Sequence, residues 1–156
     1  FENLLPPISS IVPGIKLGLS NIIVMYALFF LDKKQAMLIA FLKSLFVFLT
    51  RGLIAALLSF SGGILSVLVM VLCMYLFGEK ISYLSLSILG SVTHNIAQFT
   101  VIVFLYTNIY LWVYMPVLLI AGVVAGIATA TLLEFILPAL KKLDSNKNKY
   151  NLENQP

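Results

Sequence analysis

Charged residues are scarce in this chain. Only 10% of its 156 residues are Asp, Glu, Lys or Arg, whereas 61% are hydrophobic. Soluble domains carry roughly 25% charged residues, so the composition argues against an ordinary soluble domain and indicates a membrane protein. The net charge of +4 does not indicate a nucleic-acid partner, because the few basic residues lie mainly at the ends of apolar segments.

Cysteine, histidine and aspartate are also rare. Cys73 is the only cysteine, which excludes an internal disulfide and a thiolate metal cluster. The single histidine, His94, has no acid near it in the sequence, so it completes neither a catalytic set nor a metal site. The two aspartates, Asp32 and Asp144, are far apart and cannot form the paired acidic motif that holds magnesium and a diphosphate in prenyl transfer. The sequence also has no glycine-rich phosphate loop. We therefore expect no enzyme, no metal and no cofactor.

Long apolar runs fill most of the chain instead. About 20 apolar residues in a helix cross a bilayer. The sequence predicts five spans, at residues 14–31, 35–50, 53–77, 82–107 and 111–137. The third run contains Ser61, Gly62 and Gly63, so it is either one helix or a short element followed by a span from about residue 64. We predict an all-α, multi-pass membrane domain at 1–140 and a polar, disordered tail at 141–156.

Positive charge predicts the orientation of these spans. Lys33 and Lys34, then Lys80, then Lys141 and Lys142 follow alternate spans. The positive-inside rule places these clusters in the cytoplasm, with Arg51 as an exception. The C-terminus is then cytoplasmic and Phe1 lies outside. No cleavable signal precedes the first span, and one further helix before Phe1 would give six spans with both ends inside.

The strongest candidate site lies in the middle of the fourth span. His94, Asn95 and Gln98 occur within five residues there, and His94 and Gln98 share one face of a helix. Because hydrocarbon penalises such groups, they face either a substrate cavity or another helix. We favour the cavity and keep interhelical hydrogen bonding as the alternative.

Three further candidates lie in or directly after the first two spans. Asn21 ends the segment PGIKLGLSN, Lys43 lies mid-span, and Arg51 follows the second span. Lys43 and Arg51 are eight residues apart and point to nearly the same side of a helix, where two cations could bind phosphate or carboxylate. Snorkelling to the lipid headgroups is the alternative. Small residues at 121–129, spaced by four, predict close contact with another helix or a partner protein.

Three segments together carry a resemblance to a known family: PGIKLGLSN at 13–21, SGG at 61–63 and VTHNIAQ at 92–98. Over about residues 4–140 the chain resembles the Gx transporter family, also labelled heptaprenyl diphosphate synthase component I. That family is similar to the substrate-binding S components of energy-coupling-factor (ECF) vitamin transporters.

The resemblance implies a six-helix S component-like bundle in the bacterial cytoplasmic membrane, with a pocket that opens outward. It also implies a complex with a transmembrane T subunit and two ATPases. The chain departs from the pattern at its start, where the first S-component helix has no counterpart. The synthase label implies isoprenoid diphosphate chemistry, for which the acidic motifs are absent.

The expected function is therefore binding without catalysis. The ligand would be small, anionic, and either vitamin-like or isoprenoid-related. The residues expected to bind it are Asn21, Lys43, Arg51, His94, Asn95 and Gln98. The alternative is a non-catalytic membrane subunit that scaffolds isoprenoid or quinone (heptaprenyl diphosphate) biosynthesis.

Overall fold

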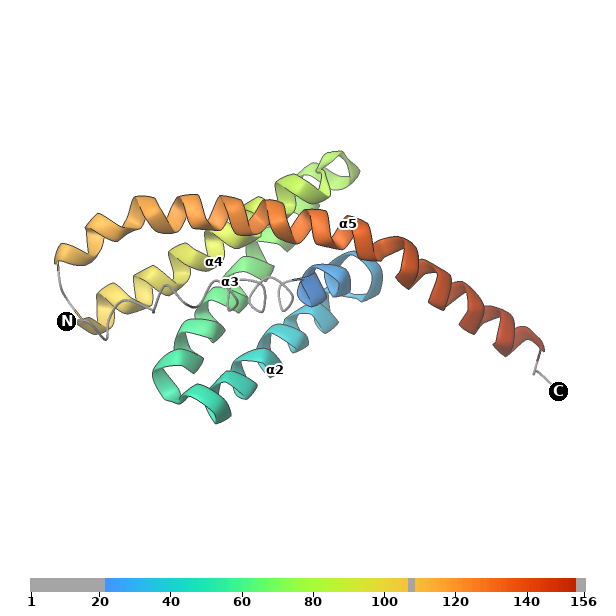
Figure 1. Cartoon of the computed structure of the whole chain (residues 1–156), viewed down its shortest axis with the longest axis horizontal. Helices are drawn as coiled ribbons and strands as arrows, with labels where there is room; N and C mark the ends of the chain where they lie inside the picture. Colours follow the sequence, from blue (N-terminus) through green and yellow to red (C-terminus); the bar gives the residue numbers. More distant parts are fainter. Residues whose placement is uncertain (1–21, 107–108, 154–156) are drawn as a thin grey trace.

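The computed structural model describes residues 22–106 and 109–153, and within these ranges the chain is helical and contains no strand (Figure 1). The elements are Ile22–Leu31, whose last five residues Ala27–Leu31 form a wider π-helical turn (η3), α2 (Lys33–Arg51), α3 (Leu53–Phe77), η4 (Gly78–Lys80), α4 (Tyr83–Tyr106), η5 (Ile109–Tyr114) and α5 (Met115–Glu153). The predicted all-α fold class is confirmed.

The third predicted span is one continuous helix. Gly62 and Gly63 lie inside α3 and both are buried, so their missing side chains make room for neighbouring helices rather than a break. Ser61 does not interrupt the helix either, because its Oγ donates a hydrogen bond to the carbonyl oxygen of Leu58 at 3.1 Å. A hydroxyl satisfied by its own helix adds little cost in an apolar environment.

Glycines end both helices of the α2–α3 pair. Gly52 has φ +87° and Gly78 has φ +58°, a region that residues with a Cβ rarely adopt. The N–H of Gly52 donates to the carbonyl of Phe48 at 3.1 Å, which closes the last turn of α2. With only Gly52 between them, α2 and α3 form a tight hairpin (Figure 1).

The C-terminal tail differs from the prediction. α5 contains Pro138 and continues to Glu153, so the backbone of residues 141–153 is helical where a disordered tail was predicted. The segment projects beyond the other helices (Figure 1). The prediction weighed the polarity of the tail, but residues 139–153 contain neither glycine nor proline, and nothing in them stops a helix.

Neighbouring helices meet through small residues. α2 packs on α3, where a Cβ atom built on Gly63 would lie 3.5 Å from Cβ of Ala40. α3 packs on α4, where Met70 fills the space above Gly90. α4 packs on α5 at Gly122 and Gly126. Small residues permit such close approach in membranes. The predicted small-residue stripe therefore contacts another helix of this chain.

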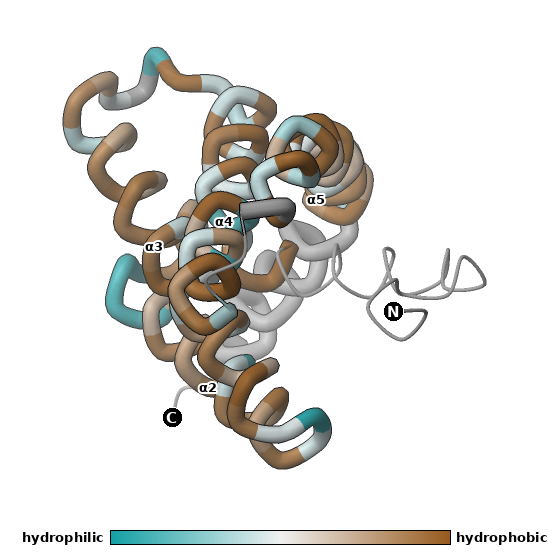
Figure 2. Tube along the Cα trace, turned by 90° about the vertical axis from the view of Figure 1, so that its left-hand side faces the viewer, coloured by the Kyte–Doolittle hydropathy of each residue, from teal (hydrophilic) through white to brown (hydrophobic). Residues whose placement is uncertain are grey.

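The outer surface of the bundle is apolar. Phe104 and Phe135 are each 83% exposed, and many other large apolar side chains point outward. Three helices are long and apolar enough to cross a bilayer: Leu53–Phe77, Tyr83–Tyr106 and Leu111–Pro138. Figure 2 shows the helices mainly in brown, with the most hydrophilic stretches at turns. A surface of this kind suits lipid rather than water, so the protein is embedded in a membrane.

Candidate functional site

His94 lies at the seam between α3 and α4. A Cβ atom built on Gly62 would lie 2.7 Å from Cε1 and Nδ1 of the His94 ring, so the ring occupies the space that Gly62 leaves. The Nε2 atoms of His94 and Gln98 are 3.1 Å apart. Because an amide nitrogen only donates, His94 Nε2 accepts this bond. The predicted pair on one helix face is present, and His94 is held against α3.

Asn95 faces the other neighbour of α4. Its Nδ2 donates a hydrogen bond to the carbonyl oxygen of Leu118 in α5 at 2.9 Å. A Cβ atom built on Gly122 would lie 3.2 Å from the same nitrogen. This is an interhelical hydrogen bond, the predicted alternative to a place in the cavity. The predicted trio therefore divides between two helix interfaces.

The two predicted cations lie in different surroundings. Lys43 is half-buried and lines a pocket, whereas Arg51 is exposed at the end of α2 and is not among the pocket residues. Eight residues of helix separate them by about 12 Å along the axis. Asn21, the remaining predicted residue, lies outside the described residues.

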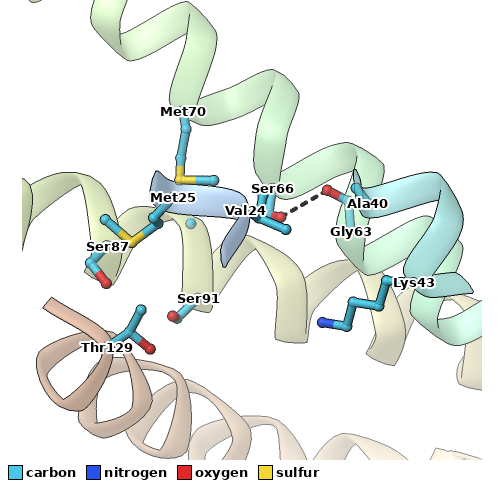
Figure 3. Close-up of a pocket in the computed structure, with 11 residues that line it drawn as sticks. Val24, Met25, Ala40, Lys43, Gly63, Ser66, Met70, Ser87, Ser91 and Thr129 are labelled. Atoms are coloured by element: carbon cyan, nitrogen blue, oxygen red, sulfur yellow. Dashed lines mark hydrogen bonds between the residues drawn. The ribbon is translucent and has the colours of Figure 1, made fainter. Parts of the chain in front are cut away.

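The pocket lies where the first described helix meets α2, α3, α4 and α5 (Figure 3). The cavity is small, with a volume of about 20 Å³, room for one or two water molecules, so a larger ligand would require the surrounding helices to move apart. The lining residues are Val24, Met25, Ala40, Lys43, Gly63, Ser66, Met70, Ser87, Gly90, Ser91 and Thr129. None of these described lining residues is acidic.

The hydroxyl groups of the pocket are not equivalent. Ser66 Oγ donates to the carbonyl of Gly63 at 2.9 Å, and Ser87 Oγ donates to the carbonyl of Gly126 at 2.7 Å. Thr129 Oγ1 is buried and has no hydrogen-bond partner among the described residues. The pocket thus offers the Lys43 ammonium and an unused hydroxyl, a combination that suits an anion.

The sequence predicts Ser91 as a flank of His94 that could line the same substrate cavity, and Thr129 only as part of the small-residue stripe. Ser87 and Ser91 are one turn apart on α4, which places them on one face. That spacing was a signal for a shared polar face. The spacing alone does not predict which neighbouring helix packs against this face.

The family model for heptaprenyl diphosphate synthase component I matches residues 1–136. The chain belongs to this family. The match covers all the residues that line the pocket. No match was found among curated proteins or among solved structures. The family resemblance stated from the three sequence segments is confirmed.

Proposed function

We propose that this protein is a membrane-embedded substrate-binding component, similar to the S components of ECF transporters, that holds a small anionic ligand without catalysis. One observation carries the proposal. The described residues that line the pocket come from five helices, and among them Lys43 contributes an ammonium group beside hydroxyls and no carboxylate. Ionisable groups at membrane depth are costly and usually serve a substrate or ion path.

Binding without reaction fits the side chains around the pocket. His94 and Asn95 are engaged at helix interfaces and do not line it. Among the described residues no three His, Cys, Asp or Glu side chains come together as a metal site. The donors among these described residues do not fit the magnesium–diphosphate centre that prenyl transfer requires.

The proposal includes partners and an orientation. The protein would cross the bacterial cytoplasmic membrane several times, with its C-terminus in the cytoplasm, as the lysine clusters favour. By its resemblance to S components, it would work with a transmembrane T subunit and two ATPases.

The family description favours a second candidate function. It names a component of a heptaprenyl diphosphate synthase, and the match extends over residues 1–136. In that case the protein would be a non-catalytic membrane subunit that works with other synthase components. The pocket would then hold an isoprenoid-related anion for the partner enzyme.

Mass spectrometry of the protein purified in mild detergent tests the anion binding that both functions require. We expect a small anion to be extracted in stoichiometric amount from the wild type. The Lys43→Met variant should lose it, because the ammonium group is removed, while Lys34→Met, an exposed lysine near the start of the same helix, should retain it.

The proteins that copurify with the chain distinguish the two candidate functions. A T subunit with ATPases supports the transporter component, and a prenyl diphosphate synthase supports the second function. A folded wild-type protein that carries no anion and takes none up when supplied would overturn both forms of the binding proposal.

A further inference from the structure

The cavity that Lys43 lines matches water in size. Its volume is about 20 Å³. A buried water molecule needs roughly 10–15 Å³ of such space and about two to four polar partners, whereas cavities that stay dry are lined by apolar groups. The polar atoms in the wall therefore decide whether this cavity is hydrated.

Three helices contribute polar side chains to that wall. Lys43 comes from α2, Ser91 from α4 and Thr129 from α5. In Figure 3 the hydroxyls of Ser91 and Thr129 lie on the same side of the pocket, and the nitrogen of Lys43 points toward that side. An ammonium group only donates hydrogen bonds, whereas a hydroxyl both donates and accepts them. Water can therefore accept a bond from Lys43 and also bond to both hydroxyls.

Thr129 contributes the polar atom that most needs such a partner. The side chain is only 1% exposed, and its Oγ1 has no hydrogen-bond partner among the described residues. Ser66 and Ser87 also line the cavity, but each already donates to a backbone carbonyl. A buried hydroxyl without a partner is costly, and a water molecule removes that cost.

We propose that one or two resident water molecules fill this cavity and link α2, α4 and α5. The water accepts a hydrogen bond from the Lys43 ammonium group and bonds to the hydroxyls of Ser91 and Thr129. Because these side chains belong to three helices, the water joins the helices where they meet. The inference goes beyond the proposed function and does not require it. A ligand that entered the pocket would displace this water.

A high-resolution crystal structure of the full chain tests the site directly. We expect one or two water peaks in the cavity, within about 3.2 Å of Thr129 Oγ1 and Ser91 Oγ. Crystals grown with bromide in place of chloride distinguish water from an anion, because bromide scatters X-rays anomalously. An anomalous peak in the cavity would overturn the proposal, and so would ordered side chains with no density between them.

Stability measurements provide a second test, because a hydrated and a dry hydroxyl predict opposite signs. Thr129→Val keeps the shape of the side chain and removes the hydroxyl. If water bonds to this hydroxyl, the substitution should raise the unfolding equilibrium constant about fivefold, since the water loses a partner. If the hydroxyl is dry, the substitution removes an unsatisfied polar group and should lower that constant. A lowered constant would contradict the bridging water.

Two further variants complete the stability test. Thr131→Val is the matched control, because Thr131 is exposed and its Oγ1 donates to Ile127 of its own helix, and it should change the constant by less than about twofold. Ser91→Ala should raise the constant, but it should add little to Thr129→Val, because the shared water is already lost. Fully additive effects would show that no water connects the two hydroxyls. If Thr129→Val does not fold, the wild-type crystal structure decides.

Discussion

Gly62 determines where the His94 ring can lie. The ring fits against α3 only because residue 62 has no side chain, and from there His94 reaches Gln98. The adjacent Gly63 faces α2 instead, where a Cβ atom would make an ordinary contact with Ala40 at 3.5 Å. Two neighbouring glycines therefore have different roles, although they are the same residue type.

We expect Gly62→Ala to lower the free energy of unfolding by about 1–3 kcal/mol, because the new methyl group displaces the His94 ring and weakens its bond to Gln98. Reversible unfolding in mixed detergent micelles measures this change in the free energy of unfolding. Gly63→Ala is the matched control and should change stability by less than about 1 kcal/mol. In a His94→Ala background the cost of Gly62→Ala should largely disappear. Equal effects of the two glycine substitutions would contradict this account.

α4 is the central helix of the described bundle. His94 on this helix meets α3, while Asn95 and Ser87 hydrogen-bond to backbone carbonyls of α5. The two helices approach closely at Gly126, since a Cβ atom there would lie 2.5 Å from Cα of Ile88. Backbone cannot rotate away as a side chain can, so this interface has no room for a methyl group.

Gly126→Ala should therefore separate α4 from α5 and break the Ser87 hydrogen bond. We expect the free energy of unfolding to fall by about 2–3 kcal/mol, near the upper end of the range for overpacking. Gly122→Ala, whose Cβ atom would lie 3.0 Å from Cα of Val92, should cost less. Ala125→Leu is the control, because Ala125 is exposed on the same helix. Unfolding in micelles ranks the three variants, and a Gly126→Ala protein as stable as the wild type would refute the close contact.

At the scale of the whole molecule, each of α3, α4 and α5 packs on the helix before it in the sequence. Sequential packing and short connections place successive turns at opposite ends of the bundle (Figure 1). α3 has 25 residues and is about 37 Å long, enough to cross the hydrocarbon layer. If it does so, its two ends lie on opposite sides of the membrane.

Labelling with an impermeant maleimide tests that orientation. In a Cys73→Ser background, Thr50→Cys and Lys80→Cys place single thiols at exposed positions on either side of α3. We expect Thr50→Cys to react in intact cells and Lys80→Cys only after permeabilisation, because the positive-inside rule puts Lys80 in the cytoplasm. The Cys73→Ser protein without an added cysteine, exposed to the same maleimide, is the control for background labelling. Reaction of both thiols from one side would show that α3 does not cross the bilayer.

Most helices of this protein follow directly from its amino-acid sequence. In an apolar environment the backbone must satisfy its own hydrogen bonds, so an uncharged run of about 20 residues has few alternatives to a helix. The predicted runs at 53–77 and 82–107 agree closely with α3 and α4 for this reason. The helical tail was missed because polarity was taken as a sign of disorder.

Lys43 was identifiable as a candidate from the sequence because a charge in mid-span is rare. Which hydroxyls share its pocket depends on how the helices pack together. A serine or threonine in a membrane helix can bond to its own helix, as Ser61 and Thr131 do, or face a neighbour, as Ser87 and Thr129 do. The residue type is the same in both cases. The difference lies in which helix packs against that face, and this depends on the glycines that set the distance between helices.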